Sequence, residues 1–126
     1  MKSKFSKELN AGTLSLVILT ILEKSAEPMY GYLIAKSLEK SAGTGGPDIK
    51  KGTIYPILRS LEKQGLLSSE VEPSDSGPPR KYYSITKHGQ SELKEWIVIW
   101  RNTREFVDNA LVLDNIVRKE KGKRNG

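Results

Sequence analysis

The stretch that decides the fold is Gly52-Thr-Ile-Tyr-Pro-Ile-Leu-Arg-Ser-Leu-Glu-Lys-Gln-Gly-Leu-Leu67. Its apolar residues recur at spacings of three and four, which is the period of one face of an α-helix. They are Ile54, Ile57, Leu58 and Leu61. Gly65 stands where a left-handed residue commonly ends a helix. The sequence therefore predicts a helix from about Lys50 to Gln64.

The residues after this helix have the pattern of a β-hairpin. Two short runs, Leu67–Glu72 and Lys81–Thr86, are separated by a segment rich in proline, serine and glycine. Such runs with a turn-rich connection indicate two antiparallel strands. In the second run Tyr83 and Ile85 share one face of the strand. Thr86 is a suitable N-cap for a following helix.

Two more helices are expected before the deciding stretch. Apolar residues at helical spacing predict the first over about Ala11–Lys24, and Pro28 separates it from a second over about Met29–Ser41. Three glycines and a proline within residues 42–47 predict a loop. Three helices followed by a two-stranded ribbon are the order of a winged helix-turn-helix. The sequence thus predicts a mainly α fold with a two-stranded β-wing over residues 11–86.

A long final helix is predicted over residues 87–119, and it is too long for so small a domain to cover. A helix that is apolar on two sides needs two partners, so we expect this one to mediate dimerisation. One side holds Leu93, Trp96, Trp100, Val107 and Ala110, and the other holds Ile99, Phe106, Leu113 and Ile116. Residues 1–10 and 120–126 are expected to form flexible tails.

The composition favours some partners and excludes several kinds of site. The 126 residues include 21 Lys and Arg against 15 Asp and Glu, and the net charge of +6 favours nucleic acid or another polyanion. The absence of cysteine excludes disulfides and thiolate metal sites. His88 is the one histidine and has no accompanying carboxylate cluster, so we expect no enzyme activity, metal or cofactor. The longest apolar run, Leu14–Leu22, is about half of a membrane span, so we expect a cytoplasmic protein without membrane contact.

The outward side of the helix in the deciding stretch is polar and basic. It presents Lys50, Lys51, Thr53, Tyr55 and Arg59, with Pro56 close to the helix start. In a helix-turn-helix such a helix enters the major groove of DNA. The hairpin tip carries two prolines beside Arg80, Lys81 and Tyr82, which suits a stiff wing that reaches phosphate. A solvated polar surface without any partner is the alternative that the residues themselves leave open.

Three segments resemble the PadR family of transcriptional regulators. They are Tyr30–Tyr32, Gly52–Leu67 and Pro78–Thr86, and the resemblance extends over about residues 13–100. It implies a homodimer that binds an operator in double-stranded DNA, usually repressing genes for detoxification, efflux or phenolic-acid metabolism. The positions that it implies face DNA are Tyr30, Thr53, Tyr55, Pro56, Arg59, Arg80 and Lys81. One departure leaves the helix start open, because Lys50-Lys51 stands where the family often has Ser-Pro.

The single C-terminal helix is similar to that of the smaller PadR subgroup. Trp96 and Trp100 lie one turn apart on this helix. In drug-sensing relatives, paired aromatics here line a pore between subunits that accepts flat hydrophobic ligands, so the resemblance allows a small aromatic effector. The dense run Ile97–Ile99 favours a solid dimer core instead. A pore and a core both remain open for Leu93, Trp96, Trp100, Val107 and Ala110.

The function predicted from the sequence is a sequence-specific DNA-binding transcriptional regulator. We expect a repressor that a small hydrophobic or aromatic effector releases from its operator. The alternative is a winged-helix interaction module whose basic face binds an acidic partner protein. Binding to a membrane surface through the basic N-terminus has little support, because no strongly amphipathic cationic helix is present.

Overall fold

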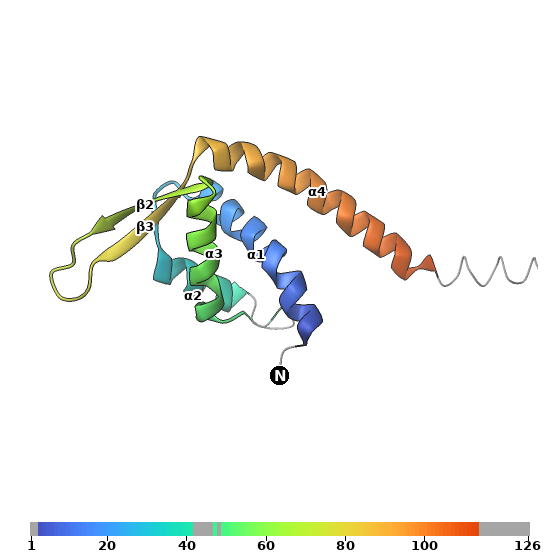
Figure 1. Cartoon of the computed structure of the whole chain (residues 1–126), viewed down its shortest axis with the longest axis horizontal. Coiled ribbons are helices and arrows are strands. Elements are labelled where there is room, and N and C mark those ends of the chain that lie inside the picture. Colours follow the sequence, from blue (N-terminus) through green and yellow to red (C-terminus); the bar gives the residue numbers. More distant parts are fainter. Residues whose placement is uncertain (1–2, 42–46, 48, 114–126) are drawn as a thin grey trace, which may run out of the picture. The chain divides into compact units, whose positions relative to one another are not determined.

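The computed structural model describes residues 3–41, 47 and 49–113 (Figure 1). The elements follow in the order α1 (Lys4–Lys24), β1 (Met29–Tyr30), α2 (Gly31–Ser41), α3 (Lys51–Lys63), β2 (Leu67–Glu72), β3 (Arg80–Ile85) and α4 (Lys87–Leu111). The chain divides into two compact units, residues 1–93 and 94–126. The first unit is a winged helix-turn-helix, which confirms the predicted fold class.

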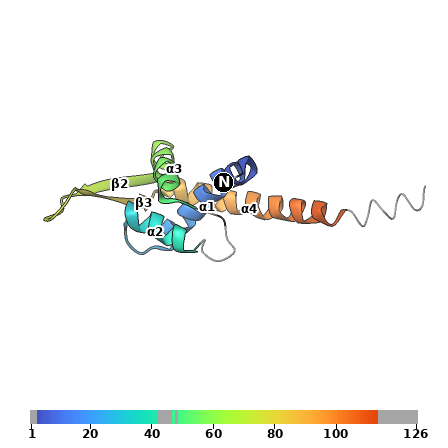
Figure 2. The same cartoon turned by 90° about the horizontal axis from the view of Figure 1, so that it is seen from below.

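The core of the first unit lies among α1, α2, α3 and the sheet, and the β2–β3 hairpin extends away from it (Figures 1 and 2). Its fully buried large side chains are Ile18, Leu19, Ile34, Ile54, Leu58, Leu61 and Leu67. Each such side chain stabilises the fold by about 1.5–3 kcal/mol relative to an exposed one. Three of them, Ile54, Leu58 and Leu61, belong to the predicted apolar stripe of α3, and its fourth member, Ile57, is half-buried. Their burial fixes which face of α3 remains outside.

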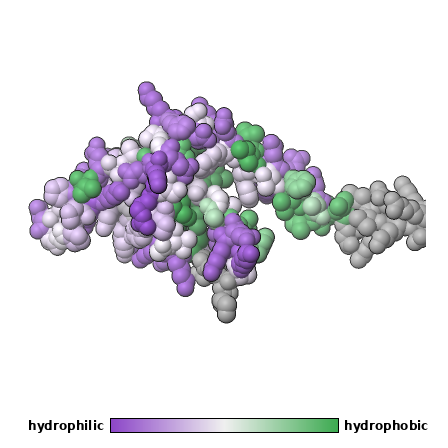
Figure 3. Space-filling model, in the orientation of Figure 1, coloured by the Kyte–Doolittle hydropathy of each residue, from purple (hydrophilic) through white to green (hydrophobic). Residues whose placement is uncertain are grey.

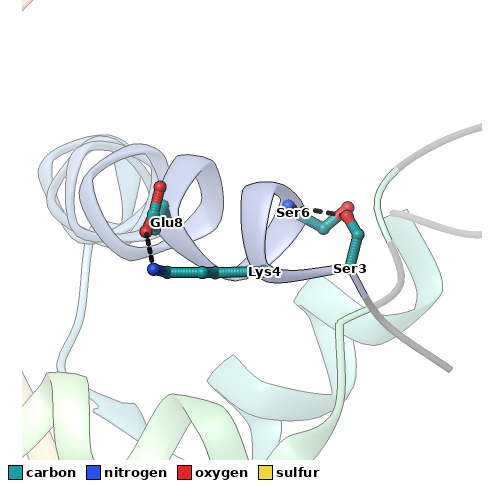
Figure 4. A network of polar contacts seen from close by, with 4 residues as sticks. All are labelled: Ser3, Lys4, Ser6 and Glu8. Atoms are coloured by element: carbon teal, nitrogen blue, oxygen red, sulfur yellow. Dashed lines mark hydrogen bonds and ion pairs between the residues drawn. The ribbon is translucent and has the colours of Figure 1, made fainter.

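The N-terminal part of α1 is held by polar contacts. α1 begins at Lys4, so the prediction of a flexible tail over residues 1–10 is wrong for its helical part. The hydroxyl of Ser3 accepts a hydrogen bond from the backbone N–H of Ser6 at 3.1 Å and caps the helix. Lys4 and Glu8 form an exposed ion pair at 3.9 Å one turn apart (Figure 4). The prediction failed because it relied on the apolar stripe, which begins further along the helix.

The sheet has three strands rather than the two predicted. Met29 and Tyr30 form the short strand β1 instead of the first turn of a helix. β1 pairs antiparallel with β3, with Tyr30 opposite Tyr82, and β2 pairs with the other edge of β3, with Leu67 opposite Ile85. A two-residue strand carries no periodicity of its own. Its pairing with a strand far along the chain decides its conformation.

The junction between α3, the sheet and α4 confirms two sequence predictions. Gly65 has φ 79°, the left-handed conformation expected at the end of α3. The hydroxyl of Thr86 accepts from the backbone N–H of Gly89 at 2.9 Å, as an N-cap does, and donates to the carbonyl of Gly65 at 2.7 Å. Gly89 has no space for a side chain, because a Cβ there would lie 2.2 Å from the carbonyl oxygen of Leu66. These contacts fix the first turn of α4 to the first unit.

α1 is long and apolar enough to cross a membrane, by length and composition alone. Four of its apolar residues, Leu14, Ile18, Leu19 and Leu22, are buried in the first unit. This burial makes α1 a core helix of the winged domain.

α4 carries apolar side chains along its second half. Figure 3 shows hydrophobic residues at the described end of this helix, where Phe106 and Leu111 are each 74% exposed. The sequence predicted that the helix continues to residue 119. Residues 114–119, the predicted tail 120–126 and most of the predicted loop 42–47 lie outside the described residues.

Candidate nucleic-acid interface

α3 has one buried face and one exposed face, at the spacing that the sequence predicted. Ile54, Leu58 and Leu61 are buried. The exposed residues of α3 and its N-cap are Lys50, Gly52, Thr53, Pro56, Arg59, Ser60 and Lys63. Lys50, Thr53, Pro56 and Arg59 therefore lie on the outer face, as expected. Ser60 and Lys63 extend the same face by one turn and were not among the predicted site residues, although their helical spacing from Pro56 and Arg59 was available.

The start of α3 has no side-chain cap. Lys50 occupies the N-cap position with an extended backbone and makes no side-chain hydrogen bond there. The N–H of Thr53 bonds to the carbonyl of Lys50 at 3.0 Å. The amides of Lys51 and Gly52 are in the first turn, where a helix offers donors and a positive dipole end to an anion. The exposed polar face of α3 thus begins at an end that is electrostatically suited to phosphate.

Three tyrosines and two cations form a connected surface cluster across α2, α3 and the sheet. The ring centroids of Tyr30 and Tyr32 are 6.0 Å apart, and those of Tyr30 and Tyr82 are 5.8 Å apart. The ammonium of Lys51 lies 4.7 Å from the centroid of the Tyr32 ring, and the guanidinium of Arg80 lies 5.2 Å from that of Tyr30. We call this set the tyrosine platform.

The tyrosine platform limits the freedom of its cations. Each cation–π contact at such an exposed site stabilises the arrangement by about 0.5–1 kcal/mol. Lys51 from α3 and Arg80 from β3 are thereby held on one continuous surface. The sequence predicted four members of the platform but not Tyr32, whose position next to Gly31 in the Tyr30–Tyr32 segment was the available signal.

Tyr55, another predicted DNA-facing residue, is half-buried. Its ring lies against α2, where a Cβ added to Gly31 would be 3.8 Å from it and 3.3 Å from the ring of Tyr83. Glycine at this position permits the close approach of α2 to α3 and β3. Tyr55 therefore contributes to the contact between the two helices of the helix-turn-helix.

Arg80 and Lys81 point to opposite faces of the wing. Successive side chains alternate across a strand, so Arg80 and Tyr82 share one face while Lys81 shares the other with buried Tyr83. The Nζ of Lys81 lies 3.0 Å from a carboxylate oxygen of Glu62 in α3. Sequence reasoning missed Glu62, because nothing in local spacing shows which strand residue meets it.

The Glu62 carboxylate has a second partner, the hydroxyl of Ser69 in β2, which donates to its other oxygen. This hydrogen bond is the largest effect on the pKa of Glu62 and lowers it below the usual value of 4.5; desolvation opposes it, and the contact with Lys81 lowers the pKa further. The hydrogen bond to Glu62 in turn raises the pKa of Lys81 above 10.5. Both groups are therefore charged near neutral pH.

The Arg80 face of the hairpin also carries acidic residues. Glu70 and Glu72 in β2 are the register partners of Tyr82 and Arg80. Together with Glu27 they line a groove of about 490 Å³ on this face. These carboxylates disfavour phosphate over the β2 edge. The surface suited to a nucleic acid is therefore the side formed by α3, Tyr32 and Arg80.

The residues predicted to form a dimer interface or ligand pore differ in how far they are buried. Leu93 is only 5% exposed and is buried within the first unit. Trp96 is half-buried, and Trp100, Val107 and Ala110 are exposed on the described part of α4. Leu93 thus belongs to the core of the winged domain, a role that its helical spacing with Trp96 and Trp100 did not reveal.

The chain is similar to one family of proteins in both sequence and fold. Residues 18–95 match the family described as Transcriptional regulator PadR-like family. The PadR family transcriptional regulator of Eggerthella lenta DSM 2243 is 40% identical, with a TM-score of 0.70 over 83% of this chain and 87% of its own. A PadR-like transcription factor of Bacteroides fragilis is 33% identical, with a TM-score of 0.66 over 85% and 98% of the two chains.

An uncharacterised protein of Lysinibacillus sphaericus is 31% identical over 94 residues, which are 75% of this chain and 83% of that protein. The family match spans more than half of the 126 residues and includes α2, α3 and the complete wing. Members of this family regulate transcription by binding DNA and are not enzymes. The chain belongs to the PadR-like family of transcriptional regulators.

Proposed function

We propose that the protein is a homodimeric, sequence-specific operator-binding repressor. One observation carries this proposal: Lys51 of α3 and Arg80 of the wing are held on adjacent rings of the tyrosine platform. A recognition helix and a wing that share one cationic surface are suited to the same DNA duplex. The basic net charge of the chain supports the same assignment.

The exposed residues of α3 provide the base contacts in this proposal. Thr53, Pro56 and Arg59 enter the major groove, where the guanidinium of Arg59 suits the O6 and N7 acceptors of guanine. Lys51 and Arg80 contact phosphates on either side of that groove and fix the register of the helix. Tyr30 and Tyr82 hold these cations in place through the platform, with Tyr32.

Dimerisation through α4 is part of the proposal. Exposed apolar residues on a helix surface favour association, and those of the described part of α4 include two pairs seven residues apart, at 99 and 106 and at 100 and 107, which is about two helical turns. They include Ile99, Trp100, Phe106, Val107 and Leu111. A two-fold dimer places two recognition helices in half-sites roughly 34 Å apart. Segment 87–119 is thus proposed as the dimerisation helix.

Repression and the effector rest on the family resemblance, and the proposed cytoplasmic location rests on the short apolar run Leu14–Leu22. A flat aromatic effector fits beside Trp96 and Trp100, one turn apart on α4. Its binding at the dimer helix would change the spacing of the two recognition helices and release the operator. Quenching of tryptophan fluorescence by planar aromatic compounds tests this step, and a flat titration indicates a solid dimer core instead.

The proposed function is tested by an electrophoretic mobility shift with the duplex upstream of the protein's own gene. We expect a shift that survives excess unrelated DNA and weakens at least about fivefold in Arg59→Ala, since one good bidentate base contact contributes about 1–3 kcal/mol. Lys24→Ala is the matched control, because Lys24 is an exposed cation at the end of α1. Equal binding of unrelated DNA contradicts sequence specificity.

A further inference from the structure

Glu62 joins the recognition helix to both strands of the wing hairpin. It lies near the end of α3, and one carboxylate oxygen is 3.0 Å from the Nζ of Lys81 in β3. The other oxygen accepts the hydrogen bond from Ser69 in β2. A single side chain therefore contacts one residue from each strand.

The register of the sheet directs Ser69 and Lys81 toward the helices. Ser69 is opposite Tyr83, and Lys81 lies two residues before Tyr83 on the same strand face. Tyr83 is buried, and the Nζ of Lys81 lies 5.3 Å from its ring centroid. Arg80 points to the opposite face, where it stacks on Tyr30. Lys81 thus already has two partners within the domain.

The contact lies close to the outer limit of the hairpin's contacts with the domain, one residue inside the stacking of Arg80 on Tyr30. Val71, which lies opposite Lys81, is exposed, and so are Glu72, the connecting residues 75–79 and Arg80. The side chain of Lys81 is 42% exposed and that of Glu62 is 31% exposed, so the pair is screened only in part. An ion pair at this position restrains the angle between the outer hairpin and α3.

We propose that Glu62 and Lys81, with Ser69, form a wing anchor, and that Lys81 is a positioning residue rather than a phosphate contact. This inference rests on the proposed DNA-binding function. The anchor holds Arg80 on the tyrosine platform at a fixed distance from α3. The wing then meets DNA already oriented, which lowers the entropy lost on binding.

The anchor is tested first without DNA, by hydrogen exchange at the amides of β2 and β3. Lys81→Glu places two carboxylates together, and Glu62→Lys places two ammonium groups together. Because a partly exposed ion pair contributes only a small free energy, we expect hydrogen exchange in the outer hairpin to become about two- to fivefold faster in each variant. The double variant Glu62→Lys/Lys81→Glu restores an ion pair and is expected to restore slow exchange. Exchange that is unchanged in both single variants overturns the anchor.

The second arm measures affinity for the operator duplex against salt concentration. Removing a phosphate contact lowers the slope of log K against log salt by about 0.9. We expect this for Arg80→Ala, whereas Lys81→Met weakens binding roughly two- to fivefold at an unchanged slope, as loss of the anchor pair predicts. The charge-swapped double variant recovers affinity to within about threefold of wild type, although position 81 is then anionic.

Two results overturn the positioning role. They are a slope lowered by about 0.9 in Lys81→Met, and a swapped variant as weak as Lys81→Glu. Failure of the wild-type protein to bind any operator duplex contradicts the proposed function instead. The exchange measurements decide the anchor separately, because they need no DNA.

Discussion

Removal of the two platform cations is expected to lower DNA affinity by an amount that follows from their number. Lys51→Ala and Arg80→Ala each remove a charge held on the tyrosine platform, at 4.7 and 5.2 Å from a ring centroid. If each cation neutralises one phosphate, each loss reduces the salt slope by about 0.9. At about 0.15 M salt, a reduction of the slope by about 0.9 corresponds to roughly a fivefold loss of affinity for each contact removed, and to about a thirtyfold loss for the double variant.

The assay is fluorescence anisotropy of a labelled operator duplex at several salt concentrations. The two losses are expected to be nearly additive in free energy, because the cations stack on different rings. Lys24→Ala controls for the change in net charge alone. A thirtyfold loss with an unchanged salt slope refutes the phosphate contacts and leaves the cations a structural role. If the affinity of the double variant for the duplex is unchanged, the DNA interface does not include the tyrosine platform.

Four further predictions concern stability and assembly. Gly89→Ala is expected to lower the free energy of unfolding in urea by about 1–3 kcal/mol, because the added Cβ would lie 2.2 Å from the Leu66 carbonyl oxygen. Gly12→Ala is expected to raise it by about 0.5–1 kcal/mol, because the space around the added Cβ is open. Glu62→Gln is expected to lower the unfolding midpoint at pH 7, where wild type gains about 0.2–1 kcal/mol from the exposed pair. The pKa of Glu62 is lowered in the folded state, so this gain is present above the unfolded value of 4.5 and is lost as pH falls through the folded pKa. If the unfolding midpoints of wild type and Glu62→Gln still differ at pH 2, the stabilising role of the ionised Glu62 is contradicted. Trp100→Asp is expected to sediment as a monomer at micromolar concentration, and an intact dimer would count against the α4 interface.

The local pattern of the sequence predicted those elements whose stability is set by neighbours along the chain. The buried stripe Ile54, Leu58 and Leu61 followed from helical period, and it fixed the outer face of α3 as well. Gly65 and Thr86 were predicted as a helix end and an N-cap because their backbone roles depend on residue type. The order of the elements then sufficed for the fold class.

The parts that were missed depend on contacts between distant segments. β1 exists because Tyr30 pairs with Tyr82, which no window around residue 30 contains. Glu62 meets Lys81 for the same reason. Arg80 and Lys81 were predicted to act together as adjacent cations, but strand alternation directs them to opposite faces. Adjacency in sequence was therefore a poor guide to which of the two lies on the proposed DNA-binding surface.

Directed DNA cleavage determines whether α3 and the wing engage one duplex together. The chain has no cysteine, so Ser60→Cys on the outer face of α3 and Ser76→Cys in the wing connection each give one site for an iron–EDTA label. We predict that both labelled proteins cut the same operator duplex, within one half-site and at neighbouring positions. Cleavage from position 60 with none from position 76, or from neither, would contradict the account.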